Sequence, residues 1–395
     1  MKMVLQASAL WLAGCTAAPM TVGDTSSDLP LANLEASWRA VFDEGDRLFD
    51  VPFREADGLG PVYIRQSCAG CHEAAARGPG FTERLVQVEH DGTATPGQPA
   101  LPLGSVVRPY ANGGASPMLA PARDDVKIFK RAGIPVMGRG WMEAIADSEL
   151  LRVEQEQAQR TDGISGRANR VRWVSEANPD TRYHAFQKGD AALGRFGLKA
   201  RQPSLDDFAA DAAQGEMGLT TVLRPHEVLN AEGIADDRKP GVDLSAEQLN
   251  TIADYVRMID IPRRRVASAR GEALFEHVGC AACHVPSLRT RDDYPLPQLA
   301  GKDARVYSDL LLHDMGVELA DAITDWDAGP REWRTAPLIG LRFLTAFLHD
   351  GRTDDLETAI RLHGSEGSEA KPSTDAFAAL SDTERAALLD FVSSL

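Results

Sequence analysis

The sequence is short of cysteine, of basic charge and of long apolar runs, and each shortage excludes a class of protein. Its 42 Lys and Arg against 58 Asp and Glu give a net charge of -16, which argues against nucleic acid as a partner. No stretch approaches about 18 uninterrupted apolar residues, so we expect no transmembrane helix. Five cysteines in 395 residues leave little for disulfides. The length itself suits two or three domains.

Four of the five cysteines lie in two pentapeptides of the form Cys-x-x-Cys-His. They are Cys68 to His72 and Cys280 to His284. This pattern is typical of c-type haem attachment, in which the two thiols bond the vinyl carbons and the next histidine binds the iron. It predicts two haems, with His72 and His284 as proximal ligands. A four-cysteine zinc site is an alternative, although its two pairs are usually about 15 to 20 residues apart. A thioredoxin-like pair would leave both histidines unexplained.

The fifth cysteine, Cys15, belongs to an export signal. Met1-Lys2 gives a positive start, residues 4–12 are apolar, and Leu12-Ala13-Gly14-Cys15 follows as a small-residue processing site. Residues 1–14 therefore resemble a bacterial lipoprotein signal, after which Cys15 would be lipidated. An ordinary cleaved signal peptide is the alternative. Both predict export, and the first predicts a lipid anchor on the periplasmic side, at the outer membrane in preference to the inner.

An internal repeat predicts the domain organisation. Five elements recur in the same order around the two haem motifs. They are 45–49 with 271–275, the Cys-x-x-Cys-His motifs, Pro135–Gly138 with Pro337–Gly340, Arg201/Leu205 with Arg352/Leu356, and 244–256 with 380–392. The repeat predicts a domain over residues 15–262 and another over residues 263–395, because Pro262 cannot easily continue the helix before it.

Local patterns predict a mainly α fold of two tandem cytochrome c-like domains, the first enlarged by insertions with a little β structure. Ser245 with Gln248 and Ser381 with Glu384 have the spacing of capping boxes at the start of two helices. Asp147-Ser148 is expected to cap another helix. Strands are expected at 85–88 and 171–174, and a turn at Asn112-Gly113-Gly114.

The order of motifs resembles the di-haem oxidoreductase (thiol oxidoreductase-like) family, which is related to bacterial di-haem cytochrome c peroxidases. The resemblance extends over nearly the whole sequence after the signal. Besides the haem motifs, it depends on segments 162–167, 194–200, 216–220, 308–316 and 348–352.

The resemblance implies different roles for the two haems. In the peroxidases the first haem reacts with peroxide and the second passes electrons to it. Glu216 occupies the position of the glutamate that, in the peroxidases, moves the proton when the O-O bond breaks. His363 falls on the sixth ligand of the second haem, where those peroxidases usually have methionine. His313 and Met315 are alternative candidates for this sixth ligand. His90 and Met118 are candidates for a displaceable ligand of the first haem.

Three positions depart from the pattern of the peroxidases, and a fourth keeps it. Leu198 replaces the tryptophan that lies between the haems, and Phe208 replaces a pocket glutamine. Arg139 lies near an asparagine that helps to bind an interdomain calcium, whereas Thr345 matches one position of that site. The sequence therefore leaves open whether calcium is a cofactor.

The sequence thus predicts an exported di-haem c-type oxidoreductase that is peroxidase-like. Its expected partners are a small electron-donor protein or a quinol-linked donor, a small oxidant such as hydrogen peroxide, and the membrane through the lipid anchor alone. The acidic charge would steer a basic donor protein, although it also serves solubility. The alternatives are a non-catalytic electron-transfer cytochrome and an oxidase of a thiol or a protein side chain.

Overall fold

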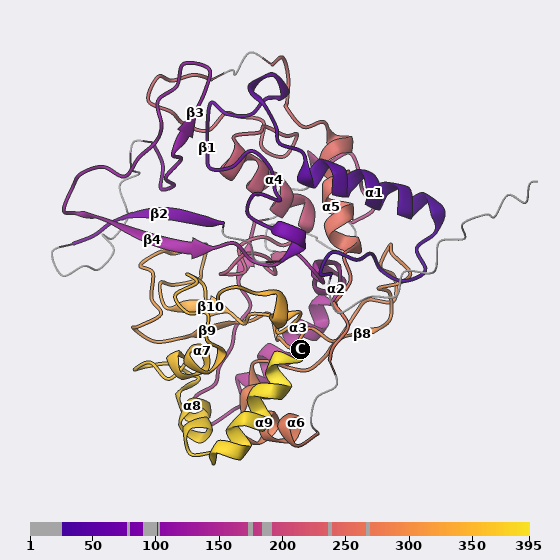
Figure 1. The fold of residues 1–395 in the computed structure, drawn as a ribbon, viewed down its shortest axis with the longest axis vertical. Helices are drawn as coiled ribbons and strands as arrows, with labels where there is room; N and C mark the ends of the chain where they lie inside the picture. The colour runs from indigo at the N-terminus through magenta and orange to yellow at the C-terminus, as the bar shows by residue number, and fades with distance from the viewer. Residues whose placement is uncertain are drawn as a thin grey trace, which may run out of the picture.

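The structure is a computed structural model, and it describes residues 26–76, 80–89, 101, 103–172, 177–183, 192–235, 239–265 and 269–395. Cys15, the export signal, His90 and the second half of the strand expected at 171–174 lie outside these residues. The described part is mostly helical with small sheets (Figure 1), as predicted. The two cytochrome c-like domains and their boundary at residue 262 stay predictions.

Nine α-helices lie in the described ranges. They are α1 (Ala36–Asp50), α2 (Arg139–Ala144), α3 (Asp147–Gln157), α4 (Leu205–Met217), α5 (Ala246–Met258), α6 (Ala269–His277), α7 (Leu356–Leu362), α8 (Lys371–Ala378) and α9 (Asp382–Ser393).

The strands of the same ranges form antiparallel pairs. They are β1 (Val62–Tyr63) with β3 (Tyr110–Ala111), β2 (Phe81–Gln87) with β4 (Val126–Ala132), β5 (Arg170–Val171) with β6 (Ala192–Leu193), β7 (Leu288–Arg289) with β8 (Asp303–Ala304), and β9 (Leu312–Asp314) with β10 (Glu332–Arg334). The longest pair, β2 with β4, contains residues 85–87 of the strand expected at 85–88 and projects to one side of the molecule (Figure 1).

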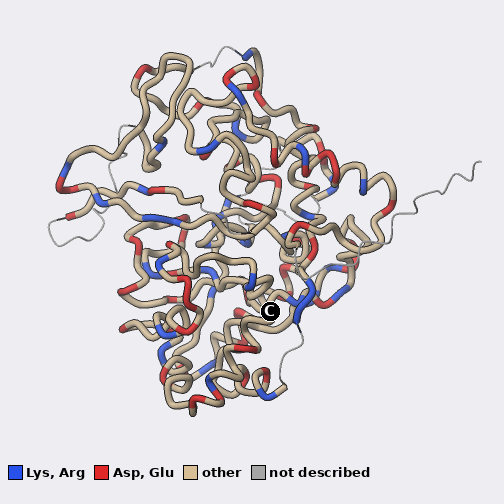
Figure 2. The backbone as a smooth tube through the Cα atoms, in the orientation of Figure 1, with Lys and Arg blue, Asp and Glu red and all other residues tan. Residues whose placement is uncertain are grey.

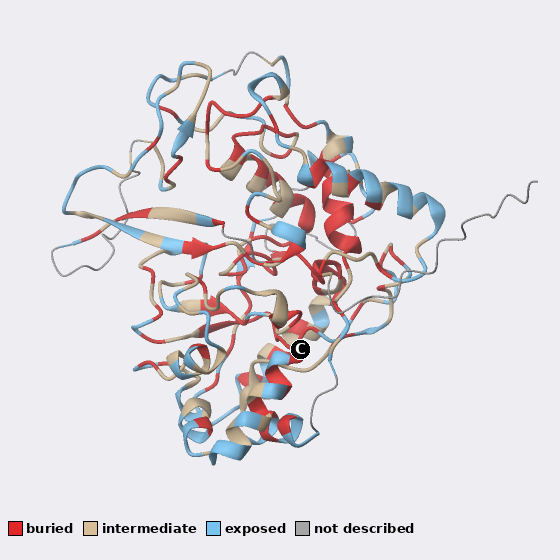
Figure 3. Cartoon of the chain, in the orientation of Figure 1, coloured by how far each residue is buried: buried red, intermediate tan, exposed pale blue. Residues whose placement is uncertain are grey.

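The repeat corresponds to two helix pairs, α1 with α5 and α6 with α9 (Figure 1). A repeated glycine explains how closely each pair packs. A Cβ at Gly45 of α1 would lie 2.4 Å from Tyr255 Cβ, and one at Gly271 of α6 would lie 2.7 Å from Phe391 Cβ. Only glycine therefore allows these helices to approach so closely. Figure 3 shows that α5 is largely buried whereas α1 keeps an exposed outer side.

Two of the three helix starts that we predicted are confirmed. The side-chain oxygens of Ser245 and Ser381 each accept a hydrogen bond from the N3 backbone, and the backbone N–H of each serine donates to the N3 side chain, which completes a capping box. The third predicted helix is present as α3, but the cap expected at Asp147-Ser148 is wrong, because the N-cap of α3 is Ala146. Asp147 is instead the first residue of the helix, and its carboxylate pairs with Arg195. The turn at Asn112-Gly113-Gly114 is confirmed.

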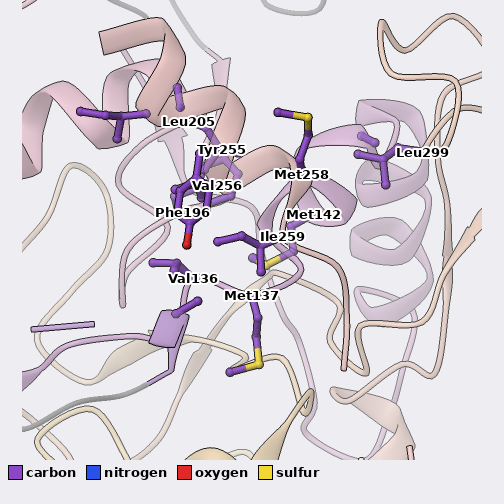
Figure 4. Close-up of a cluster of buried hydrophobic side chains, with 14 of the residues drawn as sticks. Val136, Met137, Met142, Phe196, Leu205, Tyr255, Val256, Met258, Ile259 and Leu299 are labelled. Atoms are coloured by element: carbon purple, nitrogen blue, oxygen red, sulfur yellow. The ribbon is translucent and has the colours of Figure 1, made fainter. Parts of the chain in front are cut away.

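The two Pro-apolar-apolar-Gly elements pack against each other. A Cβ at Gly138 would lie 2.6 Å from Ile339 Cδ1, and one at Gly340 would lie 2.4 Å from Met137 Sδ. The third residue of each element thus covers the glycine of the other. Figure 4 shows Met137 beside Val136 and Ile259, in the buried cluster that contains this junction.

A buried charge cluster joins the helices around this junction. Arg257 of α5 is 1% exposed and donates to Glu143 of α2 at 2.7 Å and to Asp206 of α4 at 2.6 Å. Tyr294, from the C-terminal half, also donates to Glu143 at 2.6 Å. Removing one partner of such a network leaves an uncompensated buried charge, so these contacts fix the helices relative to one another.

Candidate haem sites

The second Cys-x-x-Cys-His motif opens into a cavity of about 250 Å³. Cys280 and Cys283 lie after the end of α6, and His284 follows them on the cavity wall. The Nδ1 atom of His284 lies 3.1 Å from the carbonyl oxygen of Tyr307. That contact orients the ring and leaves Nε2 to bind a metal. Phe275 lies beside the ring, with centroids 6.5 Å apart.

His363 lines the same cavity and is held in the same way. It follows the last residue of α7, and its Nδ1 atom lies 2.8 Å from the carbonyl oxygen of Ala359. Burial lowers the pKa of His363, and burial together with the nearby His363 lowers the pKa of His284 to about 4. Both rings are therefore neutral near pH 7, which is the form that binds a metal.

The two rivals of His363 have different surroundings. His313 is buried, with Nε2 2.9 Å from Asp309 and Nδ1 2.7 Å from Glu369. Both of its ring nitrogens are thus engaged by carboxylates, which disfavours it as an iron ligand. Met315 lines the cavity and stays a rival. His313 also lies 3.7 Å from the sulfur of Cys283, so its ring adjoins the expected haem edge.

Leu198 also lines this cavity, but a tryptophan that we did not foresee lies next to it. The backbone N–H of Arg334 donates to the carbonyl of Leu198 at 2.9 Å, which places Trp333 beside it. The Trp333 ring stacks on His349 at 3.8 Å and has the ammonium of Lys199 3.9 Å from its centre. These contacts join residues far apart in the sequence, so no local pattern indicated them.

The first Cys-x-x-Cys-His motif borders a smaller cavity of about 60 Å³. Cys68, His72, Glu216 and Phe208 all line it. The structure therefore brings the expected proton-transfer residue into one cavity with the expected proximal ligand. The His72 ring lies 6.2 Å from Phe49, which repeats the contact between Phe275 and His284. Met118 is buried outside this lining and contacts Arg108.

Glu216 lies near the end of α4 in a strongly charged environment. Burial and the neighbouring Asp211 raise the pKa of the Glu216 carboxyl, while Arg84, Arg201 and Arg108 act in the opposite direction. A carboxyl whose pKa is raised toward neutrality is suited to gain and lose a proton during a reaction. The sequence indicated Glu216 only through the family resemblance.

The cysteine environments disfavour the two alternatives to haem attachment. Burial raises the pKa of Cys68 to about 12, of Cys71 to about 11 and of Cys280 to about 12, whereas reactive dithiols have lowered values. Among the described residues, the metal-type cluster around Cys283 contains Asp309 and His313 and neither cysteine of the first motif. The four thiols thus do not gather as a zinc site.

Arg139, which the resemblance places near a calcium-binding asparagine of the peroxidases, is itself a cation. Arg139 is buried, and its Nε donates to the carbonyl oxygen of Pro135 at 2.8 Å. Thr345, the matching position, is exposed. A calcium ion needs several oxygen ligands, and a guanidinium group offers none.

Each of the two cavities has a Cys-x-x-Cys-His motif, apolar walls and a histidine that is oriented or enclosed. These features define a redox protein suited to two haems. The family model described as "Di-haem oxidoreductase, putative peroxidase" matches residues 115–395, and the chain belongs to this family. Haem is accordingly its cofactor. The matched residues include the second motif and Glu216 but begin after the first motif.

Two further comparisons add little. Hydrazine synthase of Kuenenia stuttgartiensis, in a structure pressurised with 20 bar xenon, is 13% identical to the chain, with 99% of this chain and 100% of that chain covered and a TM-score of 0.36. No curated protein matches. Within the described ranges, no helix is long and apolar enough to cross a membrane.

Proposed function

We propose that the protein is an exported, peroxidase-like di-haem oxidoreductase with two covalently attached c-type haems. Electrons enter at the C-terminal haem and are used at the N-terminal haem. The observation that carries this proposal is the difference between the two cavities. The described lining of the second cavity includes two histidines whose Nδ1 atoms contact backbone carbonyls, whereas that of the first brings together His72 and Glu216.

The second site has the features of an electron-transfer centre. Two strong, fixed ligands limit rearrangement when the redox state changes, and His284 with His363 would supply them. A bis-histidine haem is expected to have a lower potential than one with methionine as the sixth ligand. The C-terminal haem would then be a good donor to the N-terminal one.

The first site has the features of a reactive centre. Haem iron, when bound, supplies the redox chemistry by which peroxide, two electrons and two protons give two waters. Glu216 takes a proton from one peroxide oxygen and delivers it to the other, for which its raised pKa suits it. Phe208 lines the same cavity without offering a hydrogen bond, so Glu216 is the carboxyl group of the described lining that can move a proton there.

A connecting segment, residues 132–138, supports electron transfer between the sites because it contacts both. Pro135 lines the second cavity, and the next residue, Val136, lines the first. The Val136 N–H donates to the carbonyl of Ala75, close to His72, at 2.8 Å. The Ala132 N–H donates to the carbonyl of His349 at 2.8 Å. The segment therefore provides a continuous covalent path between the two cavities. Such a path matters because Leu198 offers no aromatic ring at the position where the peroxidases have a tryptophan between the haems.

The remaining parts of the proposal rest on the sequence. The signal at residues 1–14 and the lipid anchor at Cys15 would place the protein on the periplasmic side of the envelope. The donor would be a small protein or a quinol-linked carrier, and the oxidant hydrogen peroxide. The net charge of -16 favours a basic donor protein.

The substitution Glu216→Gln tests the reactive role. We expect peroxide turnover to fall by about 10²- to 10⁴-fold, which is the usual contribution of general acid-base catalysis. In the wild type, turnover should decrease as the pH falls, with a midpoint above the ordinary pKa of glutamate. The Glu216→Gln variant should not show this pH-dependent decrease. Glu247→Gln, on the exposed start of α5, is the control. Unchanged turnover in Glu216→Gln would refute the assignment.

A further inference from the structure

The lining of the second cavity combines apolar walls with two buried guanidinium groups. Arg139 and Arg334 are 1% and 5% exposed, and both line the cavity. None of the described residues that line it is an aspartate or a glutamate. A buried guanidinium group whose described hydrogen bonds go to neutral oxygens gains from an anionic partner, and Arg334 is such a group. The lining therefore suits an apolar ligand that carries negative charge.

The described hydrogen bonds of Arg334 involve no carboxylate. Its Nε donates to the carbonyl of Gly197 at 3.0 Å and its Nη1 to the carbonyl of Thr335 at 2.9 Å, so its bonds within the described structure go to neutral oxygens. Burial lowers the pKa of Arg334 to about 10, and Asp309 is the acidic group that offsets this. Asp309 is itself engaged with His313 and Gln157.

We propose that Arg139 and Arg334 bind the two propionate carboxylates of the haem that is attached through Cys280 and Cys283. Haem carries two carboxylates on an otherwise apolar ring, and two guanidinium groups lie on a cavity wall that is otherwise mostly apolar. Guanidinium binds carboxylate through strong, often bidentate, charge-assisted hydrogen bonds. This inference rests on the second haem site and not on the reaction at the first.

The pair of arginines also links the two halves of the chain through the cofactor. Arg139 begins α2, directly after the Gly138 that packs on Ile339. Arg334 ends β10, which pairs with β9. A haem held by both would be fixed by the N-terminal and C-terminal repeats together. Arg139 would then supply positive charge at the junction where the related peroxidases are expected to use calcium.

The test is a redox titration of the intact di-haem protein carrying Arg139→Gln or Arg334→Gln. Loss of a nearby positive charge stabilises the oxidised haem, so the potential of the low-spin haem should fall by about 59 mV, the shift for a tenfold change in a one-electron equilibrium. The propionate bending bands in its resonance Raman spectrum should also shift. The other haem should keep its potential.

Arg195→Gln is a matched control, because Arg195 is also 5% exposed but pairs with Asp147 and lies outside the described lining of both cavities. Unchanged potential and propionate bands in both test variants would overturn the proposal. If the glutamine variants do not accumulate, Arg334→Lys takes their place: it should keep the potential and shift the propionate bands, and unshifted bands would overturn the proposal. Peroxide turnover has no part in these readouts, so failure of the proposed reaction leaves this test intact.

Discussion

At the scale of single residues, His284 and His363 are oriented by the same device. Each presents Nδ1 to a backbone carbonyl, of Tyr307 and Ala359 respectively, and both rings line one cavity. A carbonyl partner at Nδ1 fixes the ring and its tautomer and leaves Nε2 for iron. The pairing of these residues, which are far apart in the sequence, is what favours His363 over His313.

Replacing His363 with alanine should convert only the second haem from low spin to high spin. The reason is that the ring would be lost from the cavity while His284 stays anchored to Tyr307. Absorption and electron paramagnetic resonance spectra of the purified protein measure this directly. His277→Ala, on the exposed side of α6, should leave both spectra unchanged. A low-spin second haem in His363→Ala would reject His363 as the ligand.

At the scale of elements, the junction between Pro135–Gly138 and Pro337–Gly340 holds the two cavities together. Gly138 has φ +68°, and a methyl group there would meet Ile339 and Ile261. Its substitution therefore combines a backbone cost with overpacking. Gly163, with φ +90° and no atom within 4 Å of a built Cβ, would bear only the backbone cost.

We expect Gly138→Ala to destabilise the protein more than Gly163→Ala by about 1 to 3 kcal/mol, the usual cost of an added methyl group in a packed core. Denaturant unfolding of the holoprotein measures the difference. Both variants should lose some stability, since alanine is strained at positive φ. Equal losses would show that the junction is loose and would remove it as the structural link between the sites.

The elements also show what could be predicted from sequence. The helices at Ser245 and Ser381 were predictable because a capping box uses neighbours three residues apart. The cap at Asp147 failed because its carboxylate is engaged by Arg195, which lies far along the chain. Trp333, Arg139 and Arg334 were not recognised as cavity residues for the same reason. Their positions depend on contacts between segments that no local pattern records.

At the scale of the whole molecule, the acidic surface should govern association with a donor. Acidic and basic side chains occur throughout the chain (Figure 2), but the acidic ones are in excess and the net charge is -16. Electrostatic steering raises association rates between opposite charges.

With a small basic cytochrome as donor, the second-order rate constant of reduction should fall as ionic strength rises from about 0.01 M to 0.15 M, since the Debye length shortens from about 30 Å to about 8 Å. A small anionic reductant should show no such fall. Stopped-flow reduction of the oxidised protein at several salt concentrations gives both rates. A rate with the basic donor that does not depend on salt would argue against steering by the acidic surface.

The central claim is that the two haems differ, the second fully ligated and the first open to reaction. Electron paramagnetic resonance and absorption spectra of the full chain, recorded fully oxidised and half reduced, with and without peroxide or cyanide, test it most directly. The account predicts a second haem that stays low spin and six-coordinate and a first haem that binds or reacts in at least one state. If both haems are low spin and six-coordinate in every state and neither reacts, the protein is an electron-transfer cytochrome and the account is wrong.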